Sequence, residues 1–125
     1  MMILLQIALG GALGAVLRYG SVQGAARLFS IGTPAGTVFV NLLGSFIMGL
    51  VAVWFLDRVG DAKAAPFVMT GLLGGFTTFS AFSLDALTLW EQGRQTVAMV
   101  YVMGSVCGAI LALFAGVLIM RAILA

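Results

Sequence analysis

The chain has 125 residues, of which 62% are hydrophobic and 8% are charged, and its formal net charge is +2. A soluble domain carries about a quarter charged residues, so this composition excludes an ordinary soluble protein and favours one embedded in a bilayer. The sequence has no histidine and no cluster of acids at metal-ligand spacing, so we do not expect an enzyme. We expect no nucleic-acid partner either.

Four stretches with few or no charges each approach the roughly 20 residues that a helix needs to cross the hydrocarbon core. They are Met1–Leu17, Gly36–Leu56, Pro66–Leu84 and Gln95–Met120. Short connections are expected near Ala25–Ala35, Asp57–Ala65 and Glu91–Gln95. Because four spans use most of the chain, the sequence predicts an all-α integral membrane protein with one four-helix transmembrane domain, residues 1–125.

The first span begins without a basic residue and has no clear cleavage site, so we interpret it as a membrane helix rather than a signal peptide. Glycines recur four residues apart along the chain, a spacing that lets helix backbones approach closely in lipid. The pairs are Gly10/Gly14, Gly20/Gly24, Gly32/Gly36, Gly71/Gly75 and Gly104/Gly108. These pairs predict tight packing between helices and between copies of the chain.

The second span places one amide, Asn41, among Val, Leu and Phe residues. An amide in hydrocarbon is costly unless it is hydrogen-bonded. From the residue alone, an interhelical hydrogen bond and an N–H donor directed into a pore are equally good interpretations.

The third span contains GGFTTFSAFS at residues 74–83, a poor sequence for a continuous helix. Gly74 and Gly75 loosen the backbone, and the hydroxyls of Thr77 and Thr78 compete for its hydrogen bonds. We therefore predict a break with a half-helix on each side. Broken backbone at this depth must be buried in protein or line a watery cavity, and its freed carbonyls can coordinate a cation.

Two sets of side chains recur every three residues through this segment, which would give a phenyl stripe beside a hydroxyl stripe on a helix. The stripes are Phe76, Phe79, Phe82 and Thr77, Ser80, Ser83. Packing alone explains any single Phe, but the electropositive edges of paired rings can also hold a small anion without trapping it.

The fourth span places Tyr101 and Ser105 on one helix face, where they line a polar track or bond a neighbouring helix. The only cysteine, Cys107, is expected to be a small buried apolar group. Trp54 and Trp90 lie near span ends and fit an aromatic belt at the membrane interface.

The basic residues are divided equally between the two sides of a four-span protein. Three lie on the side of the termini and three on the other: Arg58, Lys63, Arg121 and Arg18, Arg27, Arg94. The positive-inside rule then specifies no orientation. One interpretation is a homodimer of oppositely oriented copies, and the other is that the tie is chance.

Three segments together resemble the Fluc fluoride channel family, also called CrcB. They are GGALGAVLRYG at 10–20, GTVFVNLLGSFIMG at 36–49 and GLLGGFTTFSAFS at 71–83. The resemblance implies an antiparallel, dual-topology homodimer in the cell (inner or plasma) membrane, with two passive fluoride pathways. It also implies a structural Na⁺ at the dimer centre, held by the main-chain carbonyls of Gly74 and Thr77.

The same resemblance assigns the fluoride pathway. The paired phenylalanines fall on Phe79 and Phe82 and the pore asparagine on Asn41, while Phe76 stays outside the pair. The polar track falls on Tyr101 and Ser105, and Arg18 matches a basic residue that attracts anions into a vestibule. Ser80 and Ser83, beside the rings, complete the predicted pathway. Relatives often carry further hydroxyls beyond Ser105, where this chain has only Ala109 and Leu113.

Two alternatives come from other classes of protein. A small multidrug-resistance transporter has similar length and topology, but proton-coupled export needs an embedded carboxylate. The first span has none, and the one candidate, Asp85, is expected to face a membrane interface. A non-transporting assembly subunit would account for the glycines but not for the break or the phenyl stripe.

Overall fold

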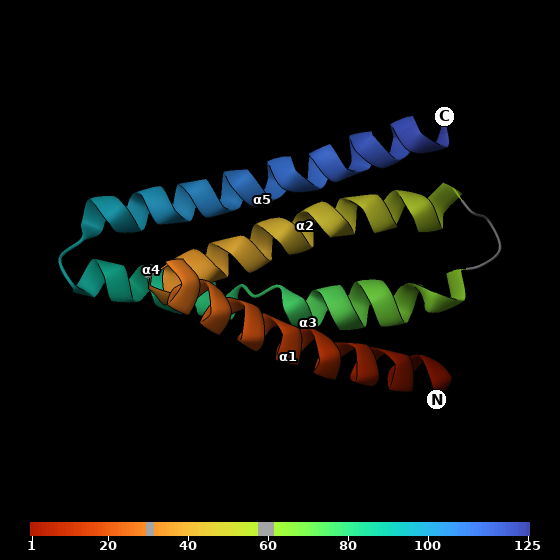
Figure 1. The fold of residues 1–125 in the computed structure, drawn as a ribbon, viewed down its shortest axis with the longest axis horizontal. Helices are drawn as coiled ribbons and strands as arrows, with labels where there is room; N and C mark the ends of the chain where they lie inside the picture. Colours follow the sequence, from red (N-terminus) through yellow and green to blue (C-terminus); the bar gives the residue numbers. More distant parts are fainter. Residues whose placement is uncertain (30–31, 58–61) are drawn as a thin grey trace.

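The computed structural model describes residues 1–29, 32–57 and 62–125. Within these residues, four helical stretches are long and apolar enough to cross a membrane, as predicted. They are Met2–Leu28, Pro34–Leu56, Ala62–Glu91 and Gln95–Leu124. Figure 1 shows them side by side, with both ends of the chain at the same end of the molecule.

The first, second and fourth spans are single helices: α1 (Met2–Phe29), α2 (Thr33–Asp57) and α5 (Gln95–Leu124). The third span is divided into four pieces. These are the 3₁₀ turn η1 (Ala62–Ala64), the π-helix η2 (Pro66–Leu73), the short α3 (Gly74–Phe76) and α4 (Ser80–Glu91). The predicted break is therefore confirmed, whereas the π-helix before it was not expected.

The helices extend beyond most of the predicted boundaries. α1 continues through Arg18 and Arg27 to Phe29, so the expected start of the first connection, at Ala25, was wrong. Composition locates the apolar part of a helix, but a helix need not end where the hydrocarbon does. Arg58, one of the residues in the charge count, lies outside the described residues.

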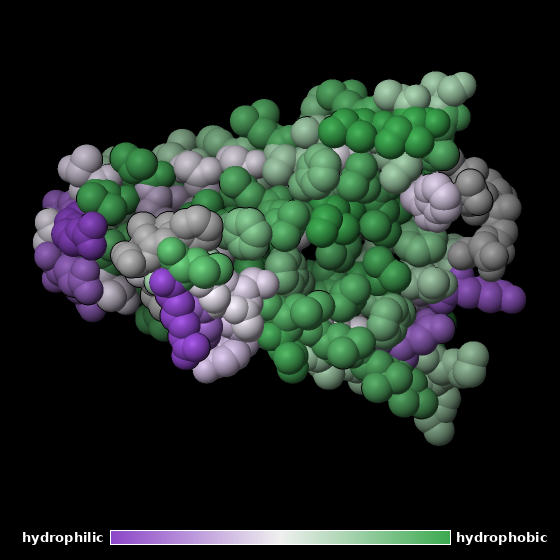
Figure 2. Space-filling view, viewed as in Figure 1, coloured by the Kyte–Doolittle hydropathy of each residue, from purple (hydrophilic) through white to green (hydrophobic). Residues whose placement is uncertain are grey.

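Hydrophobic side chains cover the middle of the molecule, and hydrophilic ones gather toward its two ends (Figure 2). Within the described part of the chain, few apolar residues are buried, among them Val40, Phe76 and Phe82. Most leucines of α1 and α5 are exposed on the surface. Such a surface suits lipid, which makes burial of apolar side chains inside the protein unnecessary.

α1 packs along η2 and α3 through glycines. A Cβ atom at Gly14 would overlap the Leu72 carbonyl oxygen, and one at Gly75 would come 2.6 Å from the Gly11 oxygen. Both clashes involve backbone, which cannot move aside as the tip of a side chain can. Gly10/Gly14 and Gly71/Gly75 are therefore the predicted close-packing pairs, and for them the prediction is confirmed.

α2 and α5 form a second close pair and run in the same direction (Figure 1). A Cβ at Gly49 would overlap the Leu113 oxygen, and one at Gly116 would overlap the Phe46 oxygen. Gly108 lies beside the Leu42 side chain. By contrast, a Cβ at Gly20, Gly24 or Gly104 would meet nothing within 4 Å, so spacing alone did not identify which glycines pack.

A tight turn joins α4 to α5. Gly93 has φ of 75°, and the Arg94 amide donates to the Leu89 carbonyl at 3.1 Å. The Gly93 amide donates to the Trp90 carbonyl at 3.0 Å. This pair of bonds with a left-handed glycine is a Schellman motif, which ends α4 and starts α5 almost at once.

Cys107 was expected to be buried, and that expectation is wrong: its side chain is exposed on α5. The lipid-facing side of a membrane helix is as apolar as its core-facing side, so hydrophobicity could not tell the two apart. Trp54 and Trp90 are partly exposed near the ends of their spans, where the sequence put them.

Candidate functional site

The break in the third span falls at residues 77–79, near the middle of the 62–91 stretch. Helix α3 ends at Phe76, and Thr77 takes an extended conformation with φ −84° and ψ 159°. Gly74 and Gly75, which were expected to loosen the backbone, are themselves helical. The chain leaves the helix two residues later than the glycines suggest.

Asn41 of α2 holds the break through both ends of its amide. Its Oδ1 accepts from the Thr78 amide at 2.7 Å, and its Nδ2 donates to the Thr78 carbonyl at 2.8 Å. One side chain thus satisfies both backbone groups of a residue that no helix includes. The interhelical interpretation of Asn41 is observed, and one amide hydrogen remains for another acceptor, since an amide nitrogen carries two.

A hydroxyl caps the second half-helix. The Thr78 Oγ1 accepts from the Ala81 amide at 3.1 Å, three residues on, as side-chain oxygens do at helix starts. On the other side of the break, the Leu73 carbonyl accepts from both the amide and the hydroxyl of Thr77, each at 3.0 Å.

These side-chain bonds leave two carbonyls without their usual helical donors. In a continuous α-helix, the Thr78 amide would bond the Gly74 carbonyl and the Ala81 amide would bond that of Thr77. Both amides are instead engaged by Asn41 and by the Thr78 hydroxyl. Gly74 is exposed on the surface of the chain although it lies at mid-span. The carbonyls concerned are the two that the sequence analysis proposed as cation ligands.

Phe79, the last residue of the break, and Phe82 of α4 form a ring pair. Their centroids are 5.3 Å apart with planes tilted by 54°, and Phe82 stacks on Tyr101 at 5.4 Å. Phe82 is buried, whereas Phe79 is 76% exposed. The expected three-membered stripe is wrong at Phe76, which ends the half-helix before the break, because a period of three holds only along an unbroken helix.

Asp85 links three helices inside the bundle. Its Oδ2 accepts from the Thr37 hydroxyl of α2 at 2.7 Å and from the Tyr101 hydroxyl of α5 at 3.1 Å. The Asp85 carboxylate, which was expected at a membrane interface, is directed toward α2 and α5. The carboxylate continues the line of contacts that begins at the Phe79 ring.

A cavity of about 340 Å³ lies between α2, the break and α5, and we call it the central pocket. Its lining residues are Asn41, Gly44, Ser45, Met48, Thr77, Thr78, Phe79, Phe82, Ser105, Val106, Ala109, Ile110 and Leu113. Ser105 is 5% exposed, and its hydroxyl is buried without a hydrogen-bond partner among the described residues. A buried hydroxyl without a partner is costly, which points to a ligand or a water.

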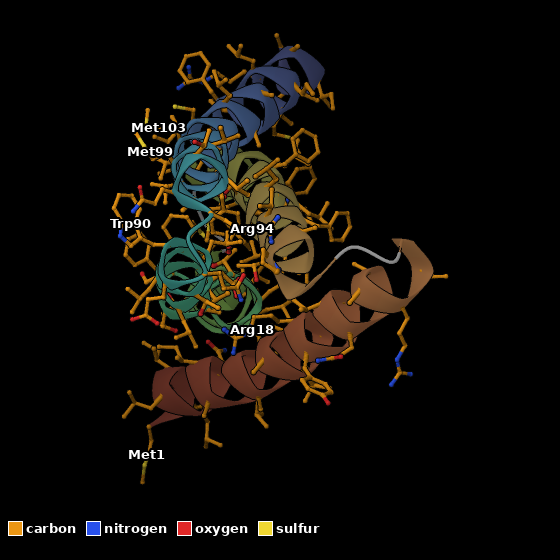
Figure 3. All side chains as sticks on the ribbon, turned by 90° about the vertical axis from the view of Figure 1, so that its left-hand side faces the viewer. Met1, Arg18, Trp90, Arg94, Met99 and Met103 are labelled. Atoms are coloured by element: carbon orange, nitrogen blue, oxygen red, sulfur yellow. The ribbon has the colours of Figure 1, made fainter. Side chains whose placement is uncertain are left out.

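A second hollow of about 540 Å³, the side pocket, separates α1 from α4. Arg18, Tyr19 and Gln23 line its α1 wall, and Ser80 and Asp85 line its α4 wall. Figure 3 shows Arg18 extending from α1 toward the third span. The two pockets share one lining residue, Thr78.

The predicted pathway residues therefore divide between several places. Asn41, Phe79, Phe82 and Ser105 meet in the central pocket. Arg18 and Ser80 line the side pocket, and Tyr101 lines neither but stacks on Phe82.

The predicted hydroxyl stripe does not form one row. Ser83 is exposed and donates to the Phe79 carbonyl at 2.9 Å, whereas Thr77 stands before α4 begins. The Ser80 Oγ lies 3.4 Å from the Oγ1 of Thr78, which is in the break.

Sequence reasoning missed one row of polar residues. Thr37, Asn41 and Ser45 are spaced by four along α2 and so share a face, which α2 turns toward the third span. The signal that identifies the row is the spacing of four residues between these three polar side chains in an otherwise apolar span.

The sequence matches the family described as "CrcB-like protein, Camphor Resistance (CrcB)" over residues 5–117. A relative from Cereibacter sphaeroides, named fluoride-specific ion channel FluC, is 53% identical over 118 residues, 94% of each chain. One of the same name from Paracoccus denitrificans is 50% identical over 97% of this chain and 96% of the relative. A third, from Mesorhizobium japonicum, is 47% identical over 96% and 97%.

Proposed function

Because this chain belongs to the CrcB family, a family of multi-pass membrane channels rather than enzymes, we propose that it is a fluoride channel. It lets fluoride leave the cell passively across the inner membrane and so lowers the internal concentration of the ion. The sequence resemblance and the relatives' names agree on this ion.

The observation that carries the proposal is the Ser105 hydroxyl, buried and unpartnered in the wall of the central pocket. A small anion is a strong hydrogen-bond acceptor. A hydroxyl without a partner can donate to it without first breaking another hydrogen bond. Phe79 and Phe82 border the same pocket with adjacent rings. Their electropositive edges replace part of the hydration shell without a full charge that would trap the ion.

The other predicted residues extend this pathway. The second amide hydrogen of Asn41 is a further donor toward the central pocket. Arg18 raises the local anion concentration in the side pocket, and Ser80 offers a hydroxyl there. Tyr101 stacks on Phe82 and so supports the ring pair. Ser83, which is exposed, is the last of the predicted pathway residues.

The test is ion efflux from liposomes that contain the purified protein, with fluoride and chloride compared side by side. Fluoride should leave only when an ionophore balances charge, and chloride should stay inside. Equal loss of both anions, or fluoride loss that requires a proton gradient, would contradict a passive fluoride channel and favour a coupled transporter.

We further propose that two copies assemble with opposite orientations and form two pathways. The even division of basic residues supports this assembly, as does the surface at the break, where Phe79 and the Gly74 backbone are exposed at mid-span. Broken backbone at that depth needs protein or water around it. A second copy covering this surface meets that need.

Charge bias tests the assembly. Adding two or three Lys residues to one side should force one orientation and abolish efflux. Co-expression with a variant of opposite bias should restore it. Full activity from one strongly biased variant alone would exclude antiparallel assembly.

A structural Na⁺ at the dimer centre is the third proposal. Hard cations prefer oxygen ligands, and channels hold alkali ions with rings of carbonyls. The Gly74 and Thr77 carbonyls fit this role because their helical donors bond elsewhere. Two carbonyls from each copy would supply four oxygens, and the ion would offset the partial negative charges of these oxygens.

The cation site can be tested directly in a crystal. Anomalous scattering from a heavier monovalent ion should appear on the two-fold axis, and Thr77→Ser should leave it there because the ligand is main-chain. Side chains packed across that axis would rule the site out.

A further inference from the structure

The hydroxyl groups that line the central pocket fall into two kinds. Thr77 donates to the Leu73 carbonyl, and the Thr78 hydroxyl accepts from the Ala81 amide. Ser45 and Ser105 line the same pocket, and among the described residues neither hydroxyl has a hydrogen-bond partner. Two hydroxyls of the pocket are therefore committed to the fold, and two are not.

The behaviour of Ser45 is unusual for a hydroxyl on a membrane helix. Such side chains commonly bond the carbonyl four residues back, as Ser83 does at 2.9 Å and Thr88 at 2.8 Å. Ser45 makes no such bond to Asn41 and remains half-buried beside the cavity. Its O–H is available to donate a hydrogen bond to an ion or a water in the central pocket.

Ser45 stands where α5 has no polar side chain. α2 and α5 run in the same direction, with Leu42 beside Gly108 and Gly49 beside Leu113 (Figure 1). Ser45 lies between Leu42 and Gly49 on α2, so it stands beside the part of α5 between Gly108 and Leu113. Beyond Ser105 the α5 residues that line the pocket are all apolar, and Ser45 of α2 lines the same pocket.

We propose that the ion pathway changes helices beyond Ser105, with the Ser45 hydroxyl of α2 acting as the next hydrogen-bond donor to the anion. The inference rests on the proposed fluoride channel and adds to it a residue on another helix. An anion that moves from Ser105 along an apolar wall would lose a hydrogen bond without replacement. Ser45 supplies one across the pocket, in the row that already contains Asn41.

The experiment moves the hydroxyl from one wall to the other. Fluoride efflux from liposomes is measured for Ser45→Ala, for Ala109→Ser and for the double variant, per folded protein on size exclusion. Ser45→Ala should lower efflux about tenfold, or about 1.4 kcal/mol in barrier. The double variant should recover to within about threefold of the original rate, because Ala109 borders the same pocket as Ser45.

Thr88→Val is the matched control. It also removes one hydroxyl from a membrane helix, but that hydroxyl bonds its own helix at Leu84 and lines neither pocket. Its efflux should equal that of the original protein. Because Ser45 has no partner to lose, Ser45→Ala should also keep the original melting temperature in detergent.

Three results would overturn the inference. They are unchanged efflux in Ser45→Ala, a loss of folded protein in that variant, which would show a structural role, and no recovery in the double variant. If the unsubstituted protein itself carries no fluoride, the proposed function fails instead, and the two failures are thereby distinguished.

Discussion

The half of the third span before the break and the half after it are held by different means. Before the break, η2 and α3 lie against α1, with backbone touching backbone at Gly14 and Gly75. After the break, α4 is attached to α2 and α5 through side chains: the Asp85 carboxylate and the Phe82 ring. The first contact includes close backbone approaches at glycines, and the second includes hydrogen bonds and ring stacking between side chains.

The difference shows how a small membrane protein separates anchoring from function. Glycine contacts fix the first half to α1 through close backbone packing. Both pockets lie instead along the second half, where side chains hold the helices apart and leave space between them. The break therefore connects η2 and α3, which are packed against α1, to α4, which lines the pockets with side chains.

The largest effect is expected from Gly14→Val, on the glycine-packed side. Its Cβ would overlap the Leu72 carbonyl oxygen, and since the clash is with backbone, the helices must separate. Overpacking usually costs about 1–3 kcal/mol, and this contact belongs at or above the top of that range. We expect little folded protein on size exclusion.

Gly20→Val is the control for this comparison, because a Cβ at Gly20 meets nothing within 4 Å although the glycine spacing is the same. It should yield folded protein in normal amounts. Equal losses in both variants would mean that contacts outside the single chain decide the outcome.

The next effect concerns the break itself. Asn41→Ala removes both bonds to Thr78 and leaves a buried N–H and C=O without partners, at about 1–3 kcal/mol each. The melting temperature in detergent should fall clearly, and fluoride efflux should fall with it. A variant as stable as the original would show that the break does not need Asn41.

The ring pair should affect transport more than stability. Phe79→Ile and Phe82→Ile should each give a folded dimer whose fluoride efflux is lower at least tenfold, about 1.4 kcal/mol in barrier. Phe76→Leu, on the anchoring side, should change efflux little per folded protein. If all three variants behave alike in liposome efflux, the rings serve packing only.

The smallest effect should come from Tyr101→Phe. The substitution keeps the ring that stacks on Phe82 and removes only the bond to Asp85, which also accepts from Thr37. Such a bond contributes about 0.5–1.5 kcal/mol, so a small drop in melting temperature and less than about a threefold change in efflux are expected. Tyr101→Leu, which removes the ring as well, should cost more in both measurements.

Hydropathy was sufficient to predict the four spans, because twenty apolar residues in a row leave few alternatives. The break was also legible, since glycines and threonines both weaken a helix. Its position was not, because it is fixed by Asn41, a residue 37 positions away from Thr78 in the sequence. Nor could spacing alone distinguish Gly14, which touches backbone, from Gly20, which touches nothing.

Some residues of the candidate site could be predicted from the sequence, and others depend on contacts between helices. Phe79, Phe82 and Ser105 line one pocket, because Phe79 and Phe82 lie at the start of α4 and α4 packs against α5. Asp85 was expected at a membrane interface because a charged residue near a span end normally faces water. Only the fold shows that Thr37 and Tyr101 give its carboxylate two donors inside the bundle.

The side-chain bonds at the break have a consequence for hydrogen exchange. A helical amide exchanges when its helix frays or opens, but the Thr78 amide is held by Asn41 and the Ala81 amide by the Thr78 hydroxyl. The exchange of these two protons therefore depends on side-chain partners from α2 and from the break, not on the backbone ladder of α4. The Thr78 proton is a single-atom probe of whether α2 and the third span stay docked, independent of any measurement of ion flow.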